Sequence, residues 1–350
     1  MWAVLLISLL LSVNLSQSAN YECSSDCPFH PTYWKGRCCI SNLALLNPSE
    51  MNEFKIRPIH ANHIVVTFAN LTTKALTSKF LKHIKGLKHL HVVHGNVPSI
   101  QLSPNLLSLH VAGCGLEKLI INEQDSYKLQ TLELQDPALT KLPTGINKLT
   151  HLTKLIISHT KIKMLNLSEL QGLNELQELR IRYGFLDTIH TGQRLSLPNL
   201  RLFQLTGNLL SSLDVSNWDM PNMRRFDVTH NRLKKIDHLS TAFPELKIIR
   251  LWRNDWSCQW LREDGRKFLS RNVIDPSMVI LPDEDCTGSL EAGICCDLPP
   301  GTFPQPEERF RHCAGDKGPN FVCSELTDGN VAKYQRMTPR AEILQALKLN

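Results

Sequence analysis

The sequence predicts an α/β solenoid, an arc of stacked repeats with a parallel sheet on its concave side and a disulfide-bonded cap at each end. Two observations predict this fold class: a leucine pattern recurs through the middle of the chain, and cysteines gather both before and after it. They divide the chain into residues 1–18, an expected signal peptide; 19–62, a cysteine-rich N-terminal cap; 63–256, the repeats; 257–325, a cysteine-rich C-terminal cap; and 326–350, a short tail with a helix pattern.

The repeat follows the pattern LxxLxLxxNxL, and successive copies begin 19, 23, 23, 24, 24, 23 and 23 residues apart. An irregular copy lies upstream, where Ile64, Val66 and Phe68 alternate as in a strand. The offsets within a copy do not fit one face of a helix, and the period is that of the leucine-rich repeat. The eight regular copies begin at Leu87, Leu106, Leu129, Leu152, Leu176, Leu200, Met223 and Leu246.

The alternation of side chains within each LxL segment explains why such repeats must stack. One set of side chains faces inward and the other faces outward. A single repeat cannot bury its apolar row, but neighbouring repeats bury their rows against each other. Roughly half a dozen aliphatic side chains per repeat contribute about 1.5–3 kcal/mol each before chain entropy is subtracted. The outward side chains then line the concave sheet.

The Asn of the repeat normally bonds to backbone groups in the turn after each strand and forms a ladder along the solenoid. Asn208, Asn231 and Asn254 keep this residue. Because Gly and Pro offer no side-chain hydrogen bond, we expect a broken ladder and a less regular N-terminal half. The equivalent upstream positions hold Gly95, Cys114, Pro137, Thr160 and Gly184.

The 11 cysteines divide between the two ends of the repeats, with Cys114 between them at the Asn position. We expect two disulfides in the N-terminal cap, three in the C-terminal cap, and a buried free thiol at Cys114. Paired C-x2-C spacings are absent, which disfavours structural zinc, and no cofactor is expected. Six cysteines permit 15 pairings, so the connectivity stays open. The disulfide candidates are Cys23, Cys27, Cys38 and Cys39 before the repeats and Cys258, Cys286, Cys295, Cys296, Cys313 and Cys323 after them.

The N-terminal segment predicts secretion. Trp2–Val13 is a continuous apolar run, shorter than the roughly 20 residues that span a bilayer. It has the length of a signal-peptide core, and Ser16 and Ser18 suit cleavage before Ala19, although a buried strand or helix is the alternative. We therefore expect an extracellular protein without a membrane span. The sequons beginning at Asn70 and Asn166 are candidate glycosylation sites.

The segment Asn254–Leu261 reads NDWSCQWL, and its Trp256 and Trp260 are expected to plug the open end of the core. Together with the adjacent pair Cys295 and Cys296, the signal peptide and the repeat period, this segment resembles the secreted leucine-rich-repeat immune proteins of mosquitoes. Members of that family commonly carry a long C-terminal coiled coil that joins them into disulfide-linked complexes. The resemblance implies binding and stabilisation of complement-like thioester proteins.

The tail after Cys323 departs from that family pattern. Pro339 can begin a short helix through Ile343, Leu344 and Leu347, which is under two heptads. A coiled coil needs three to four heptads. The chain therefore resembles the members that lack the coil, and its oligomeric state stays open.

Motifs and charge exclude several function classes. The sequence contains no nucleophile elbow, HExxH, P-loop or dinucleotide motif, so we expect no enzyme activity. The net charge of +6 is spread along the chain without a dense Lys/Arg tract, so we expect no nucleic-acid partner.

Two clusters stand out among the outward strand positions. His89, His91 and His110 bring three imidazoles together, which suit a metal or a pH sensor. Ordinary polar exposure is preferred there, because no carboxylate or Cys completes a metal site. The second cluster consists of residue types that dominate interfaces and suits an acidic protein surface or an anionic glycan. Its members are Arg180, Arg182, Tyr183, Arg225, Arg250, Trp252 and Arg253.

The alternative for the second cluster is a solvated basic face, partly neutralised by Glu178 and Asp227. The sequence as a whole predicts a secreted binding protein that works in innate-immune recognition or scaffolding through its concave face. A general adhesion or matrix protein, or a soluble receptor decoy, is the alternative with the same fold. A secreted enzyme or inhibitor is the rival of a different class, and no motif supports it.

Overall fold

The computed structural model describes residues 20–21, 37–47, 55–56, 64–265, 288–291 and 294–297 of the chain. The expected signal peptide and the tail lie outside the described residues. So do five of the disulfide candidates, namely Cys23, Cys27, Cys286, Cys313 and Cys323.

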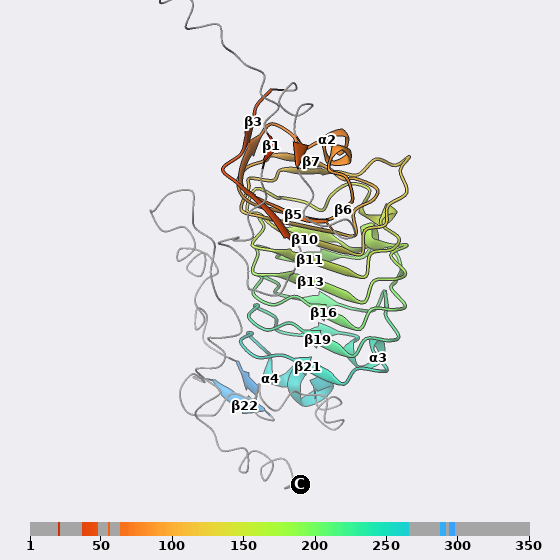
Figure 1. Cartoon of the computed structure of the whole chain (residues 1–350). Helices are drawn as coiled ribbons and strands as arrows, with labels where there is room; N and C mark the ends of the chain where they lie inside the picture. Colours follow the sequence, from red (N-terminus) through yellow and green to blue (C-terminus); the bar gives the residue numbers. More distant parts are fainter. Residues whose placement is uncertain are drawn as a thin grey trace, which may run out of the picture.

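The described residues form a stack of chain coils, each contributing one strand to a parallel sheet (Figure 1). The sheet has 11 strands in the order β2-β5-β6-β8-β10-β11-β13-β16-β19-β21, with β3 also paired to β5. The strands are β2 (Arg37–Ser41), β3 (Ala44–Leu45), β5 (Ile64–Thr73), β6 (Leu87–Asn96), β8 (Ser108–Ala112), β10 (Thr131–Gln135), β11 (Lys154–Ser158), β13 (Glu178–Arg182), β16 (Leu202–Gln204), β19 (Arg225–Asp227) and β21 (Ile248–Arg250).

The register of the sheet follows the repeat. Leu132 lies opposite Leu109 on one side and Leu155 on the other, and Leu155 lies opposite Leu179. Equivalent leucines therefore form continuous inward rows, because any slip by one residue would turn them toward solvent. The predicted solenoid of stacked repeats is confirmed.

The return segments of the coils carry short strand pairs and single helical turns. The helical part of the predicted α/β solenoid is thus small. The paired strands are β7 (Ser99–Gln101) with β9 (Lys118–Ile120), β12 (Met164–Asn166) with β14 (Thr188–His190), β15 (Leu195–Ser196) with β18 (Trp218–Asp219), and β17 (Leu213–Asp214) with β20 (Ile236–Asp237). The helical turns are α2 (Ser78–His83), η1 (Ile146–Lys148), η2 (Leu167–Leu170), α3 (Leu239–Ala242), α4 (Cys258–Trp260) and η3 (Leu261–Gly265). At the ends of the described chain, β1 (Asn20–Tyr21) pairs with β4 (Lys55–Ile56), and β22 (Ser289–Glu291) with β23 (Ile294–Cys296).

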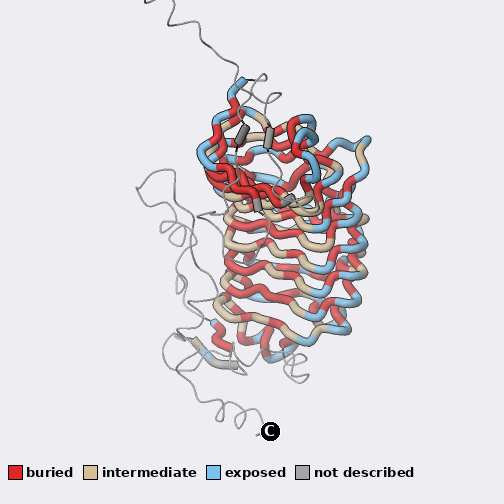
Figure 2. The backbone as a smooth tube through the Cα atoms, in the orientation of Figure 1, coloured by how far each residue is buried: buried red, intermediate tan, exposed pale blue. Residues whose placement is uncertain are grey.

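The core runs along the inside of the coils as an unbroken buried column (Figure 2). It is largely aliphatic in the middle of the stack and becomes aromatic toward β19. Phe226 lies 5.9 Å from Phe203 and 6.2 Å from Trp218 between ring centroids, the latter in a T-shaped contact. The larger rings fill the same cross-section that leucines fill upstream.

In several repeats a residue with left-handed backbone conformation stands seven residues after the first leucine, near the point where the strand of the sheet ends. This position holds His94, His159, Tyr183, His230 and Arg253, with φ between 53° and 60°. Non-glycine residues rarely adopt this conformation, so the surrounding turn must impose it. The chain thereby turns sharply at one edge of the sheet and delivers the next residue to the Asn position.

The predicted Asn ladder is present where the sequence keeps Asn. The Nδ2 group of Asn231 donates to the carbonyls of Leu205 and Val228 at 2.9 and 3.0 Å, and its Oδ1 accepts from the N–H of Leu210 at 3.2 Å. Asn208 and Asn254 repeat this arrangement. Each Asn side chain therefore joins two neighbouring coils, because its Nδ2 group donates to a carbonyl of each coil and its Oδ1 accepts a backbone N–H.

The expectation of a broken ladder in the N-terminal half is only partly correct, because Asp136 replaces the missing Asn. This residue is fully buried, and its Oδ2 accepts from the N–H of Cys114 at 2.8 Å while Oδ1 accepts from Ala138 at 3.0 Å. The thiol of Cys114 lies 3.6 Å from the carbonyl of Val92. The sequence pattern missed Asp136 because it stands one position before the expected one.

The C-terminal cap seals the core as the sequence predicts. Trp256 is buried, stacks on Trp260 with ring centroids 4.9 Å apart, and donates from Nε1 to the carbonyl of Leu251. A disulfide joins Cys258 to Cys296, which brings the β22-β23 hairpin against the last coil.

The remaining described disulfide candidates are bonded as well, and the division of two disulfides in one cap and three in the other stays a prediction. Cys38, Cys39 and Cys295 are disulfide-bonded. Cys114 is the free cysteine among the described residues, and it is buried. Burial, and then the carboxylate of Asp136, raises the pKa of its thiol. The thiol therefore stays protonated within the core.

Candidate partner-binding face

The outward side chains of the sheet form three parallel rows, which together are called the concave face. The middle row is fixed by the strand register and runs through His110, Glu133, Ile156 and Arg180. Successive members lie about 4.8 Å apart, the spacing of neighbouring strands. The first row runs through His89, Ser108, Thr131, Lys154, Glu178, Leu202, Arg225 and Ile248; the middle row continues to Gln204, Asp227 and Arg250; and the third row includes Ser158, Arg182, Thr206, Thr229 and Trp252.

The predicted cluster is distributed over this face and its rim. Arg180, Arg182, Arg225, Arg250 and Trp252 occupy the rows, and all are half-buried. Tyr183 and Arg253 instead occupy the left-handed turn position, so they lie at the edge where the strands end. The structure therefore gathers the predicted residues on β13, β19, β21 and their turns, with β16 between them.

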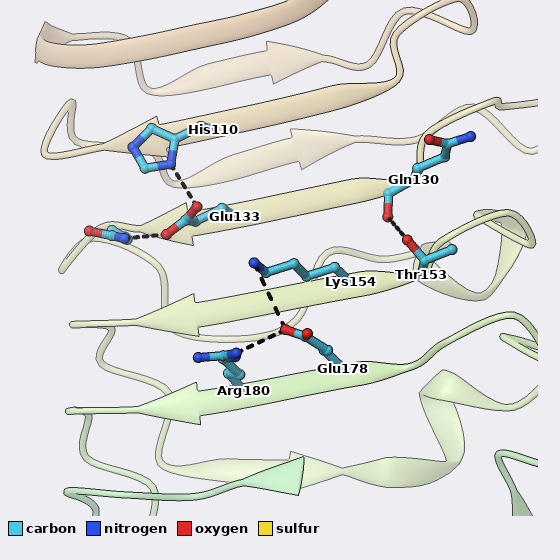
Figure 3. A network of polar contacts seen from close by, with 8 residues as sticks. His110, Gln130, Glu133, Thr153, Lys154, Glu178 and Arg180 are labelled. Carbon is cyan, nitrogen blue, oxygen red and sulfur yellow. Dashed lines mark hydrogen bonds and ion pairs between the residues drawn. The ribbon is translucent and has the colours of Figure 1, made fainter. Parts of the chain in front are cut away.

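Glu133 on β10 is the centre of a polar network (Figure 3). The network lies on the part of the face before β13, which is called the upstream half; β13 and the later strands with their turns are the downstream half. Its carboxylate contacts Nδ1 of His110 at 3.1 Å and accepts from the side-chain amide of Gln135 at 2.6 Å. Burial alone would raise the pKa of Glu133, but the hydrogen bond and charge of His110, with smaller effects of Gln135 and Lys154, lower it to about 2.

The predicted histidine cluster is only partly assembled. His91 lies opposite His110 with ring centroids 5.5 Å apart, as the sequence predicts. His89 instead contacts the hydroxyl of Ser108 at 2.7 Å. A carboxylate does lie beside one of them, because Glu133 on the next strand contacts His110. Even so, the described residues include no group of three or more His, Cys, Asp or Glu side chains arranged to hold a metal ion.

Two of the predicted arginines are paired with carboxylates on the face itself. Arg180 contacts Glu178 at 3.0 Å, and Lys154 approaches the same carboxylate at 3.8 Å (Figure 3). Arg250 lies 3.5 Å from Asp227, whose side chain is only 7% exposed. The positive charges of Arg180 and Arg250 are thus largely compensated by these two carboxylates.

The buried carboxylate of Asp227 is held by more than Arg250. Its Oδ1 accepts from the hydroxyls of Thr206 and Thr229 at 3.0 and 2.8 Å and from the N–H of Thr229 at 3.1 Å. A carboxylate with this many donors is fixed in position. Asp227, near the centre of the downstream half, is therefore held rigidly, and the donors that satisfy its carboxylate come from the protein itself.

Arg182 and Arg225 differ from the other two, since neither has an ion pair within the described part of the chain. The Nε atom of Arg182 is buried without a hydrogen-bond partner, and its guanidinium lies 5.7 Å from the ring centroid of Tyr183. Arg225 stands in the first row between Leu202 and Ile248, both partly exposed. These two arginines offer donors that no other described residue uses.

The aromatic side chains of Trp252 and Tyr183, in the downstream half of the face, are held by contacts with neighbouring rings. Trp252 packs edge-on against His230 at 4.8 Å and under the guanidinium of Arg253 at 4.5 Å. Tyr183 lies 5.6 Å from the ring of His159. Neither histidine was among the predicted site residues, although both stand seven residues after the first leucine of a repeat, which is a signal in the sequence that identifies them.

The two sequons lie on exposed positions. Asn70 lies within β5 with a left-handed φ of 58°, and its side chain donates to Oδ1 of Asn42 at 2.7 Å. Asn166 caps η2, and its Oδ1 accepts from the N–H of Ser168. Glycosylation at either residue stays a prediction.

Comparisons with known proteins find the same repeat and the same fold. The family model for the leucine rich repeat matches residues 174–233. The fold is a leucine-rich-repeat solenoid. The leucine-rich-repeat domain of mosquito APL1B is similar, with 17% identity and a TM-score of 0.51 over 72% of this chain and 75% of that one. The mosquito LRIM1/APL1C complex gives 16% identity and a TM-score of 0.52 over 89% of this chain and 63% of that one.

These likenesses show the leucine-rich-repeat fold, and no curated protein matches the sequence. Among the described residues, no helix is long and apolar enough to cross a membrane. The concave face presents charges, amides and rings on a rigid sheet, which suits the binding of another molecule.

Proposed function

We propose that this chain is a secreted leucine-rich-repeat binding protein that captures an extracellular protein through the downstream half of its concave face. The downstream half comprises β13, β16, β19, β21 and their turns. The observation that carries the proposal is the combination there of the half-buried Trp252 with two arginines, Arg182 and Arg225, that form no ion pair with any described residue. Arg and Trp dominate interface hot spots, and here Arg182 and Arg225 stand on β13 and β19 while Trp252 follows β21.

The proposed biological setting is innate-immune recognition or scaffolding. The resemblance of the cysteine caps and the NDWSC segment to mosquito immune proteins supports it, as does the likeness of the fold to APL1B and to the LRIM1/APL1C complex. The partner is proposed to be an extracellular protein, and a complement-like factor is one candidate. The apolar run at the N-terminus supports secretion.

Affinity capture from the body fluid of the source animal tests this function. The tagged protein would be compared with a variant carrying Arg182→Glu, Arg225→Glu and Trp252→Ala. We expect the variant to bind the partner at least about tenfold more weakly, which is roughly 1.4 kcal/mol or more of binding free energy. A variant with Lys148→Glu and Lys163→Glu, two exposed residues of the return segments, is the control for charge. Equal capture by all three proteins would contradict the proposal.

A further inference from the structure

The four predicted arginines of the rows divide into two classes, and the division defines what a ligand can contact. Arg180 and Arg250 are neutralised by Glu178 and Asp227. Arg182 and Arg225 have no carboxylate partner in the described residues. We infer that Arg182, Gln204 and Arg225 form one diagonal binding track for an extended acidic peptide segment that also carries an apolar side chain. This inference rests on the proposed function and deepens it.

The three residues lie on one diagonal of the sheet. Arg182 is in the third row on β13, Gln204 in the middle row on β16, and Arg225 in the first row on β19. Two strand spacings and four residues along a strand separate the ends of the track, a diagonal of roughly 16 Å. Two carboxylates four residues apart in an extended segment are about 13 Å apart and on the same side, within reach of two long arginine side chains.

Gln204 supplies the middle contact of the track. Its Nε2 donates to the hydroxyl of Thr206 at 3.1 Å, which fixes the direction of the amide. Its Oε1 has no hydrogen-bond partner among the residues that the structure describes. An acceptor held midway between two guanidinium groups suits a backbone N–H of the bound segment. The track therefore offers charge at both ends and a backbone contact between them.

The surroundings of Arg225 favour a peptide over a sulfated or uronic-acid glycan. Leu202 and Ile248 flank this arginine on both neighbouring strands and are partly exposed. A glycan makes little use of two aliphatic side chains, whereas a leucine or valine of a peptide buries apolar surface against them. Removal of water at the same time strengthens the contact between Arg225 and a carboxylate.

Fluorescence anisotropy with labelled peptides tests the track. The probe is a Ser/Gly/Thr peptide of about twelve residues with two glutamates four residues apart and a leucine two residues beyond the second, so that all three face the same side. Matched probes replace both glutamates with glutamine or the leucine with serine. A heparin-derived hexasaccharide is tested in parallel. The protein is used as the wild-type chain and as three variants.

The variants separate the track from general charge. The variant with Arg182→Gln and Arg225→Gln should bind the glutamate–leucine peptide at least about tenfold more weakly than the wild-type chain. Glu178→Gln with Arg180→Gln removes a paired couple without changing net charge, and it should change binding less than about threefold. Lys148→Gln with Lys163→Gln repeats the charge change elsewhere and should also have little effect. Replacing the peptide leucine should weaken binding to the wild-type chain several-fold, by roughly 1 kcal/mol.

Two results would overturn the inference. Binding of the hexasaccharide, together with equal affinity for the leucine and serine peptides, would assign the track to an anionic glycan. Failure of every peptide to bind would reject the acidic segment. If the natural partner still depended on Arg182, Arg225 and Trp252 in affinity capture, the proposed function would survive that failure.

Discussion

The upstream and downstream halves of the solenoid use the same coil but differ in how neighbouring coils are joined. Downstream, Asn208, Asn231 and Asn254 each donate to carbonyls of two coils and accept one N–H. Upstream, Asp136 only accepts, and the thiol of Cys114 is a weak donor. The downstream coils are therefore tied more firmly, and this is the half that carries Arg182, Arg225 and Trp252.

This difference has a functional meaning. A hot spot binds tightly when its side chains are ordered before the partner arrives, because less conformational entropy is lost on binding. The downstream half meets this condition through its Asn ladder and through the network around Asp227. The upstream half presents a polar network around Glu133 whose charges are largely satisfied within the protein.

The largest expected effect is at the downstream end. Trp256→Ala removes a buried ring that stacks on Trp260 and closes the last coil. We expect a loss of about 3–5 kcal/mol in the free energy of unfolding, measured by denaturant titration. Gln259→Ala, an exposed residue of α4, is the control and should change stability little. An unchanged unfolding midpoint for Trp256→Ala would show that the ring does not seal the core.

The two ladders are compared directly by removing one member of each. Asn231→Ala leaves two carbonyls and one N–H without this partner, and we expect a loss of about 2–4 kcal/mol. Asp136→Ala removes the acceptor of two N–H groups, and we expect about 1–3 kcal/mol. Paired thermal and denaturant melts measure both. A larger loss for Asp136→Ala would reverse the proposed order of the two halves.

The upstream network predicts a specific dependence of stability on pH. The pKa of Glu133 is lowered in the folded state to about 2 from its ordinary 4.5. Its stabilisation is therefore fully present above pH 4.5 and is lost as the pH falls toward 2. Glu133→Gln should flatten the decline in this window by about 1–3 kcal/mol, measured by denaturant titration at several pH values. An identical decline in both proteins would show that the carboxylate is not stabilised by His110.

The smallest expected effect concerns Cys114. Because burial and Asp136 raise the pKa of its thiol, we expect no reaction with iodoacetamide at neutral pH in the native protein. Denaturation should make the peptide that contains Cys114 reactive, as judged by mass spectrometry. Rapid native labelling at this residue would mean that the upstream coils open far more readily than the ladder implies.

Much of the fold was predictable, because the repeat period dictates which leucines share a row. The pairing of Leu132 with Leu155 follows from that period alone. The role of Asp136 was not predictable, since it depends on a turn that places the carboxylate where an Asn one residue later would normally reach. Among the site residues, the outward positions followed from alternation. That no described carboxylate pairs with Arg225 could not be read from the sequence, because it depends on where each nearby carboxylate lies in space.

Capture of the natural partner by two half-face variants tests the central claim most directly. One variant carries His91→Ala, His110→Ala and Glu133→Gln on the upstream half, and the other carries Arg182→Glu, Arg225→Glu and Trp252→Ala on the downstream half. We predict that the upstream variant keeps its affinity within about threefold, while the downstream variant loses at least about tenfold, or roughly 1.4 kcal/mol. Loss of capture by the upstream variant, with the downstream variant unaffected, would contradict the account.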